Sequence, residues 1–223
     1  MSTRIDFTAK SGATASGEFA SPDGTGPAGG VVLIQEWWGV NAHIQSLVAR
    51  LADAGFNVLA PDLYHGQIAT DPKRAEEMMN ALDFAKAVDE VAGAVEHLRA
   101  APRSTGKVAI MGFCMGGAVT LAAAAAIPAL DAAVPFYGIP GAADFTKIKA
   151  PVLGHFAKRD TFVPVTKAEE VKRQIESAGG SMELEVYDAQ HAFVNDTRPE
   201  VYDAANAKLA WDRSIAFLRK RLS

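Results

Sequence analysis

Short apolar runs alternate with stretches of helical periodicity along most of the chain. The apolar runs have the length of strands and little polar alternation, and they predict strands over 29–36, 56–62, 107–113, 132–138, 151–156 and 182–188. Between these runs, apolar residues recur every three or four positions, which predicts helices over 41–55, 72–100, 115–126, 164–178 and 199–221. Two further strands near the start, 3–10 and 14–20, are expected to form an antiparallel hairpin.

This alternation predicts an α/β fold with a mostly parallel central sheet and helices on both faces, because strands covered on both sides are apolar throughout. Asn41 and Gly55 are the expected start and stop signals of the first helix. No repeat or shift in composition divides the 223 residues, so a single domain over 1–223 is expected. In such sheets, functional residues collect at the carboxyl ends of the strands.

Composition and charge favour a small-molecule substrate over a polyanion or a lipid surface. Lysine and arginine total 22 and aspartate and glutamate total 26, which gives a net charge of −4. The basic cluster of Arg219, Lys220 and Arg221 ends a predicted helix, where it complements the helix dipole. The opening segment has no apolar core typical of an export signal. We therefore expect a cytoplasmic protein without nucleic-acid or membrane partners, a monomer in the first instance and a dimer as the alternative.

The single cysteine, Cys114, lies between a predicted strand and a predicted helix, with glycine two residues away on either side at Gly112 and Gly116. This spacing is typical of a nucleophile elbow, a sharp turn where larger residues would collide with the neighbouring backbone. The helix amino end favours negative charge on sulfur and on an oxyanion, so the backbone N–H of Met115 is a candidate oxyanion donor. The alternative is an inert buried cysteine. One cysteine forms no internal disulfide, and no metal-ligand motif is present in the sequence, so neither a metal nor another cofactor is expected.

A nucleophile at this elbow needs an acid after a later strand and a histidine after the last one. Asp160 follows the strand at 151–156 and His191 follows the last strand, while Asp62 and Asp188 are weaker candidates for the acid. The remaining histidines have structural interpretations, and they are His43, His65, His97 and His155. We therefore expect Cys114, Asp160 and His191 to meet at one edge of the sheet.

The loop after the strand at 29–36 carries a carboxylate and two indoles. The backbone N–H of Trp37 is the candidate second oxyanion donor, and a carboxylate at Glu36 would disfavour the thiolate form of a neighbouring cysteine. Aromatic side chains are expected around a largely neutral entrance suited to apolar ligands, namely Trp37, Trp38, Tyr64 and Tyr137. The stretch 65–83 is a candidate lid.

Six segments spread over nearly the whole chain together resemble the dienelactone hydrolase family of α/β hydrolases. They are QEWWGV (35–40), PDLY (61–64), GFCMGG (112–117), FYG (136–138), DTFVP (160–164) and QHAF (190–193). The resemblance implies the α/β-hydrolase fold, Cys114 as nucleophile, His191 as base and then acid, and Asp160 as the group that orients it. It also implies that Glu36 holds the resting thiol neutral until substrate displaces it, with Trp37 and Met115 as the oxyanion donors.

The reaction that the resemblance implies is hydrolysis of a lactone or carboxylic ester through an acyl thioester. Family members acting on dienelactone hold its carboxylate with two arginines, whose positions here are occupied by Asn195 and Pro72. Arg198 and Arg74 lie nearby in the sequence and are candidate replacements. We therefore expect a substrate less anionic than dienelactone. A broad carboxylesterase or thioesterase is the alternative, and a non-catalytic redox-sensing thiol is a further one.

Overall fold

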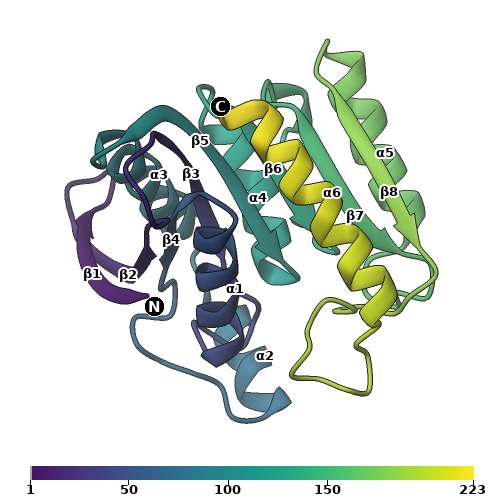
Figure 1. Ribbon diagram of the computed structural model, residues 1–223. Coiled ribbons are helices and arrows are strands. Elements are labelled where there is room, and N and C mark those ends of the chain that lie inside the picture. Colours follow the sequence, from purple (N-terminus) through teal and green to yellow (C-terminus); the bar gives the residue numbers. More distant parts are fainter. Residues whose placement is uncertain (1) are drawn as a thin grey trace.

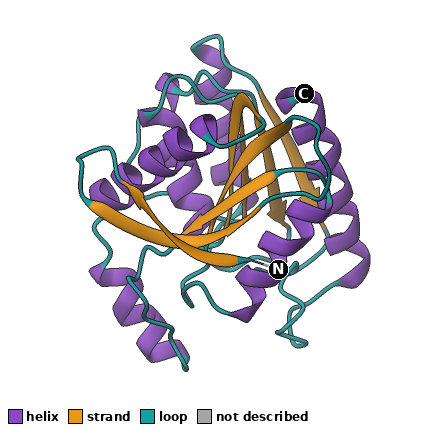
Figure 2. Cartoon of the chain, turned by 60° about the vertical axis from the view of Figure 1, so that its left-hand side comes forward, coloured by secondary structure: helices purple, strands orange, loops and turns teal. Residues whose placement is uncertain are grey.

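The computed structural model describes residues 2–223, so Met1 lies outside the described part of the chain. The described strands form one sheet in the order β1-β2-β4-β3-β5-β6-β7-β8. Their bounds are β1 (Thr3–Thr8), β2 (Thr14–Ala20), β3 (Ala28–Ile34), β4 (Asn57–Pro61), β5 (Ser104–Phe113), β6 (Ala132–Phe136), β7 (Val152–Ala157) and β8 (Met182–Tyr187). Strand β2 pairs antiparallel with both β1 and β4, and the other neighbours are parallel. The sheet twists, so the β1-β2 hairpin lies across the direction of the later strands (Figure 2).

Helices cover both faces of this sheet, as the alternation of strands and helices predicts (Figure 1). Their bounds are α1 (Ala42–Asp53), α2 (Pro72–Ala81), α3 (Phe84–Ala100), α4 (Met115–Ala126), α5 (Val165–Ser177) and α6 (Ala204–Leu222). Helices α1 and α6 pack on one face, while α3, α4 and α5 pack on the other. The prediction of a mostly parallel sheet with a hairpin at its start is confirmed.

The apolar strands alternate between two cores. In β3, Val32 and Ile34 pack into the core under α3 and α4, while Val31 and Leu33 pack into the core under α1 and α6. Every residue of β3 is buried because both faces are covered. The strand therefore ends in the interior of the molecule, and the loop after it starts beside the carboxyl ends of its neighbours.

Two helix predictions need correction. The periodic stretch 72–100 is two helices, because Leu82 adopts an extended conformation with ψ 120° and Asp83 starts a new helix by accepting bonds from the N–H groups of Ala85 and Lys86. The last helix begins at residue 204, five residues later than the periodicity predicts, because Asp203 caps it. None of the helices between residues 2 and 223 combines the length and apolar character that crossing a bilayer requires.

Candidate active site

Cys114 stands on a sharp turn between β5 and α4. Its φ of 54° lies in the left-handed region that non-glycine residues rarely adopt. The turn is held by hydrogen bonds at both ends, since the N–H of Cys114 donates to the carbonyl of Phe136 at 3.1 Å and its own carbonyl accepts from Gly117 at 2.9 Å. A Cβ on Gly116 would lie 2.5 Å from the carbonyl oxygen of Ile34, so only glycine fits there without a shift. The strand, turn and helix therefore hold the sulfur at the carboxyl edge of the sheet.

An acid and a histidine from two neighbouring strand ends meet beside this turn. Oδ2 of Asp160, after β7, lies 2.7 Å from Nδ1 of His191, after β8. The second carboxylate oxygen accepts from the backbone N–H groups of Phe162 at 2.8 Å and Val163 at 3.0 Å. The Asp160 side chain is fully buried and that of His191 is 15% exposed. The carboxylate therefore fixes the orientation of the imidazole.

The imidazole of His191 is strongly basic in this setting. Burial lowers its pKa, but the hydrogen bond to Asp160, together with the hydrogen bond and negative charge of the Cys114 sulfur, raises it to about 10. The rings of Tyr137 and Phe162 pack against the imidazole with centroid distances of 5.0 Å and 5.1 Å. The structure thus brings together Cys114, His191 and Asp160 in an arrangement that can form a thiolate–imidazolium pair.

Glu36 lies just beyond β3 and is buried, with 2% of its surface exposed. Its Oε2 accepts from Nδ2 of Asn195 at 2.6 Å, while Oε1 is buried without a hydrogen-bond partner among the described residues. Burial raises the pKa of Glu36, and the electrostatic interaction with His43, the bond from Asn195 and the interactions with His191 and Arg198 partly oppose that rise. Whether the Glu36 carboxyl is protonated therefore depends on its burial and on these few neighbouring groups.

A cavity of about 540 Å³ contains these groups. Glu36, Cys114 and His191 line it, and so do Trp37 and Met115, the candidate oxyanion donors. The other lining side chains are mostly apolar or aromatic and include Trp38, Met79, Leu82, Phe84, Ile139, Phe162 and Val163. Such a lining suits a small uncharged molecule that exposes one polar carbonyl.

Two further candidates for substrate contact also line this cavity. Tyr137 is fully buried, and its hydroxyl has no partner in the described part of the chain. Burial raises the pKa of this phenol well above its ordinary value, so the hydroxyl stays neutral. Arg198 pairs with Glu200 at 2.8 Å and lies 5.8 Å from the ring centre of Trp38. Its charge is therefore partly compensated within the protein.

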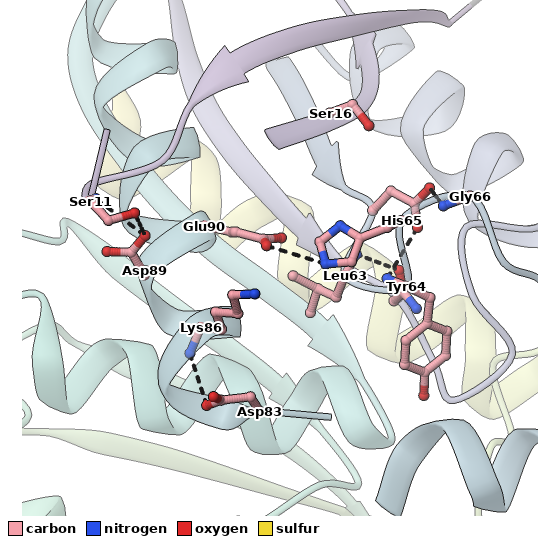
Figure 3. A network of polar contacts seen from close by, with 12 residues as sticks. Ser11, Ser16, Leu63, Tyr64, His65, Gly66, Asp83, Lys86, Asp89 and Glu90 are labelled. Carbon is pink, nitrogen blue, oxygen red and sulfur yellow. Dashed lines mark hydrogen bonds and ion pairs between the residues drawn. The ribbon is translucent and has the colours of Figure 1, made fainter. Parts of the chain in front are cut away.

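Tyr64 and Arg74 lie elsewhere, contrary to the expectation that they contact the substrate. Both line a second cavity of about 390 Å³, which His65 also lines, and Figure 3 shows Tyr64 next to His65. Arg74 donates to Gln67 at 2.6 Å, and the hydroxyl of Tyr64 donates to Sδ of Met115 at 3.1 Å. For Arg74 the reason is the break between α2 and α3, which sets α2 apart from α3 with this polar cavity between them. Tyr64 thus contacts Met115, which lines the Cys114 cavity, and among the described residues it is not itself part of that lining.

Asn195 also differs from its expected place. It is 1% exposed and bonds to Glu36, and the cavity lining does not include it among the described residues. The cavity lining also includes Phe162, Met79, Leu82 and Phe84, which were not predicted to lie there. A signal for the last three was present, because apolar residues at 79, 82 and 84 do not continue one helical face.

The rival histidine and acids have other partners. His155 is buried in β7 between the hydroxyls of Tyr187 at 2.8 Å and Ser214 at 2.9 Å. Burial, with the charge of Arg213, lowers its pKa to about 3, so it stays neutral. This matches a satisfied core histidine.

The rival acids form ion pairs instead of bonding to His191. Asp62 pairs with Arg4 at 2.9 Å. Asp188 is exposed and pairs with Arg159 at 3.3 Å. Both carboxylates are thereby engaged away from the Cys114 cavity.

Comparison with known proteins gives a consistent result. A model of the dienelactone hydrolase family matches residues 16–222. The protein usf of Aquifex pyrophilus is 34% identical, and the match covers 100% of both chains. A protein of Aquifex aeolicus (strain VF5), provisionally named carboxymethylenebutenolidase, is 33% identical, and the match again covers 100% of both chains.

Solved structures extend this similarity. A dienelactone hydrolase-like promiscuous phosphotriesterase, P91, from metagenomic libraries superposes with a TM-score of 0.88 and 26% identity, covering 100% of this chain and 99% of that one. The esterase Pf2001 of Pyrococcus furiosus superposes with a TM-score of 0.72 at 17% identity, covering 100% of this chain and 94% of that one. The second comparison shows that the fold is shared.

Proposed function

This chain belongs to the dienelactone hydrolase family and is a carboxylic ester hydrolase, and from that premise we propose that it cleaves lactones or esters through a Cys114–His191–Asp160 triad. The observation that carries the proposal is the strained Cys114 beside an imidazole that Asp160 holds at 2.7 Å. All three side chains come from carboxyl ends of parallel strands, so the sheet pre-organises them. An acyl thioester on Cys114 is the expected intermediate.

In the first half of the reaction, the thiolate of Cys114 forms a bond to the carbonyl carbon and the carbonyl π electrons move to oxygen. The backbone N–H groups of Trp37 and Met115 donate to that oxyanion. When the tetrahedral species collapses, the C–O bond to the leaving oxygen breaks and that oxygen takes the proton of the His191 imidazolium. For a lactone, the leaving oxygen stays attached to the acyl chain.

In the second half, water attacks the thioester and gives a proton to His191. The second tetrahedral species expels the thiolate of Cys114, and the carboxylic acid product leaves. Asp160 keeps the imidazole oriented in both halves because its carboxylate also accepts two backbone N–H groups. Glu36 is proposed to act as a gate that meets the resting thiol and gives way to substrate.

The cavity supports a substrate that is less anionic than dienelactone. The basic side chains in the described cavity lining are Arg198 and His191. The guanidinium of Arg198 already pairs with Glu200. Arg74 lines the other cavity. Aromatic surface at Trp38 and Phe162 offers contacts to an apolar acyl or alcohol group. A broad carboxylesterase or thioesterase would use the same machinery.

Two measurements test the proposal. Cys114→Ala should lower turnover of a neutral 4-nitrophenyl ester on the order of 10³-fold or more, and mass spectrometry of the wild type should detect an acyl adduct on this cysteine. Unchanged turnover would overturn the triad and would favour a redox thiol on a scaffold that hydrolyses by other means. Comparison of kcat/KM for dienelactone and the neutral ester tests the substrate class, and a strong dienelactone preference lost in Arg198→Ala would contradict it.

A further inference from the structure

Asn195 is a buried amide at the edge of the candidate site, and hydrogen bonds at both ends hold it in place. It lies between β8 and α6, is 1% exposed, and its Oδ1 accepts from both the backbone N–H of Thr197 at 3.1 Å and the hydroxyl of Thr197 at 2.6 Å. These two bonds fix which end of the amide faces inward. The NH₂ group therefore points at Glu36 and donates to Oε2 at 2.6 Å.

Glu36 has few other partners. Its Oε1 is buried and accepts no hydrogen bond from the described residues. The titratable and charged groups around it are His43 of α1, His191 and Arg198 of the segment after β8, and the hydroxyl of Tyr137 after β6. His43 is itself tied to Asp196, because its Nδ1 lies 3.1 Å from Oδ1 of that residue. A single amide thus supplies the only hydrogen bond that the described structure gives this carboxyl.

A buried carboxylate with one donor is sensitive to the loss of that donor. A hydrogen bond to the charged form favours it, so removal of the donor keeps the carboxyl protonated to higher pH. Glu36 and Cys114 line the same cavity, and a negative charge there opposes formation of a thiolate. The amide is therefore coupled to the sulfur through the carboxyl.

We propose that Asn195 is a positioning residue that holds Glu36 by one oxygen, favours its charged form, and in this way sets the pH range over which Cys114 becomes reactive. The proposal rests on the proposed function of Cys114 as nucleophile. It assigns Asn195 a role inside the protein, instead of the substrate contact that its sequence position suggests. Thr197 supports that role by fixing the amide.

Alkylation of the thiol by iodoacetamide tests the proposal directly, because Cys114 is the single cysteine and the rate needs no ester turnover. The rate is measured against pH in the wild type, Asn195→Ala, Glu36→Gln and the double variant. In Asn195→Ala the midpoint of the alkylation profile should move roughly half a pH unit or more to lower pH, toward that of Glu36→Gln. In the Glu36→Gln background, the additional change Asn195→Ala should produce no further shift.

Two variants complete the design. Thr197→Val removes the hydroxyl that orients the amide and keeps the backbone N–H, so a smaller shift in the same direction is expected even if Asn195→Ala folds poorly. Asn206→Ala removes another side-chain amide, which bonds to Asp203, and should leave the midpoint unchanged. An unchanged midpoint in both Asn195→Ala and Thr197→Val, or an equal shift with and without Glu36, would overturn the proposal. Failure of the proposed function would instead be seen as ester turnover that survives Cys114→Ala.

Discussion

The carboxylate of Asp160 and the imidazole of His191 are 2.7 Å apart although 31 residues separate them in the chain. Strands β7 and β8 are parallel neighbours, so their carboxyl ends deliver the two side chains to the same edge. The two backbone N–H groups that bond to the other oxygen of Asp160 prevent the carboxylate from turning away. This leaves Nε2 of the imidazole as the nitrogen that can exchange protons in the cavity.

The first prediction concerns this pair. Asp160→Asn keeps the size of the side chain but removes its charge, and the amide can present N–H instead of oxygen to Nδ1, which favours the wrong tautomer. We expect kcat on a 4-nitrophenyl ester to fall on the order of 10²–10⁴-fold. Asp188→Asn is the matched control, because it neutralises an exposed carboxylate near the same strand ends. A loss of only a few-fold in Asp160→Asn would contradict the orienting role.

The second prediction concerns stability and pH. The pKa of His191 rises from 6.5 to about 10 in the folded protein, since Asp160 and Cys114 outweigh the effect of burial. A group with a raised folded pKa binds its proton more tightly in the native state, so its contribution is complete below about pH 6.5 and is lost as pH rises through 10. The difference in unfolding free energy between wild type and His191→Gln should therefore shrink from pH 6.5 to 10. Urea titrations at several pH values measure it, and a constant or growing difference would refute the assignment.

Much of the fold could be predicted because its signals are local. Asn41 caps α1 by accepting from Ile44 at 3.2 Å, and Gly55 ends that segment with φ 105°. The elbow at Cys114 was visible because the glycine spacing and the strand-to-helix transition lie within a few residues. The pairing of Asp160 with His191 was predictable from strand order alone, since parallel strands end at a common edge.

Other features depend on three-dimensional geometry that the spacing of apolar residues in the sequence does not reveal. The extended ψ at Leu82 divides the stretch 72–100, which the apolar spacing on either side of the break predicted as one helix, and Arg74 on α2 lines a separate cavity. The orientation of the Asn195 amide depends on Thr197, two residues away, and on Glu36, which is distant in sequence. Such side-chain choices follow from packing, which the linear pattern does not record.

The third prediction concerns the tight approach of the elbow to the neighbouring strand. Gly116→Ala would place a methyl group 2.5 Å from the carbonyl oxygens of Ile34 and Gln35, which are backbone atoms that cannot give way cheaply. We expect destabilisation of about 1–3 kcal/mol or more, measured as the change in urea unfolding free energy. Gly141→Ala is the control, because a Cβ there meets no atom of the described residues within 4 Å, and this change should alter stability by less than about 0.5 kcal/mol. Equal effects at the two positions would contradict the close approach.

The fourth prediction concerns Phe162, which is 71% exposed although it lines the cavity and packs 5.1 Å from the His191 ring. A side chain this exposed buries little apolar surface on folding, so its truncation should cost little stability. Phe162→Ala should therefore unfold at nearly the wild-type denaturant concentration. Its ring can instead cover the aromatic part of a bound ester, and loss of a pair worth about 0.5–1.5 kcal/mol should raise KM roughly two- to tenfold with kcat nearly unchanged.

Leu209→Ala gives the matched comparison for Phe162→Ala, because Leu209 is 44% exposed on α6 and is not among the residues that line the cavity. Both variants remove apolar surface that is already in water, so neither should alter folding. Steady-state kinetics with an aromatic ester and an aliphatic ester then distinguishes a contact between the ring and the substrate from a general effect of removing exposed apolar surface. If Phe162→Ala raises KM for the aromatic ester more than for the aliphatic one, the ring contacts the substrate. If instead kcat falls and KM stays constant for both esters, the ring acts on the imidazole of His191, and the proposed substrate contact is wrong.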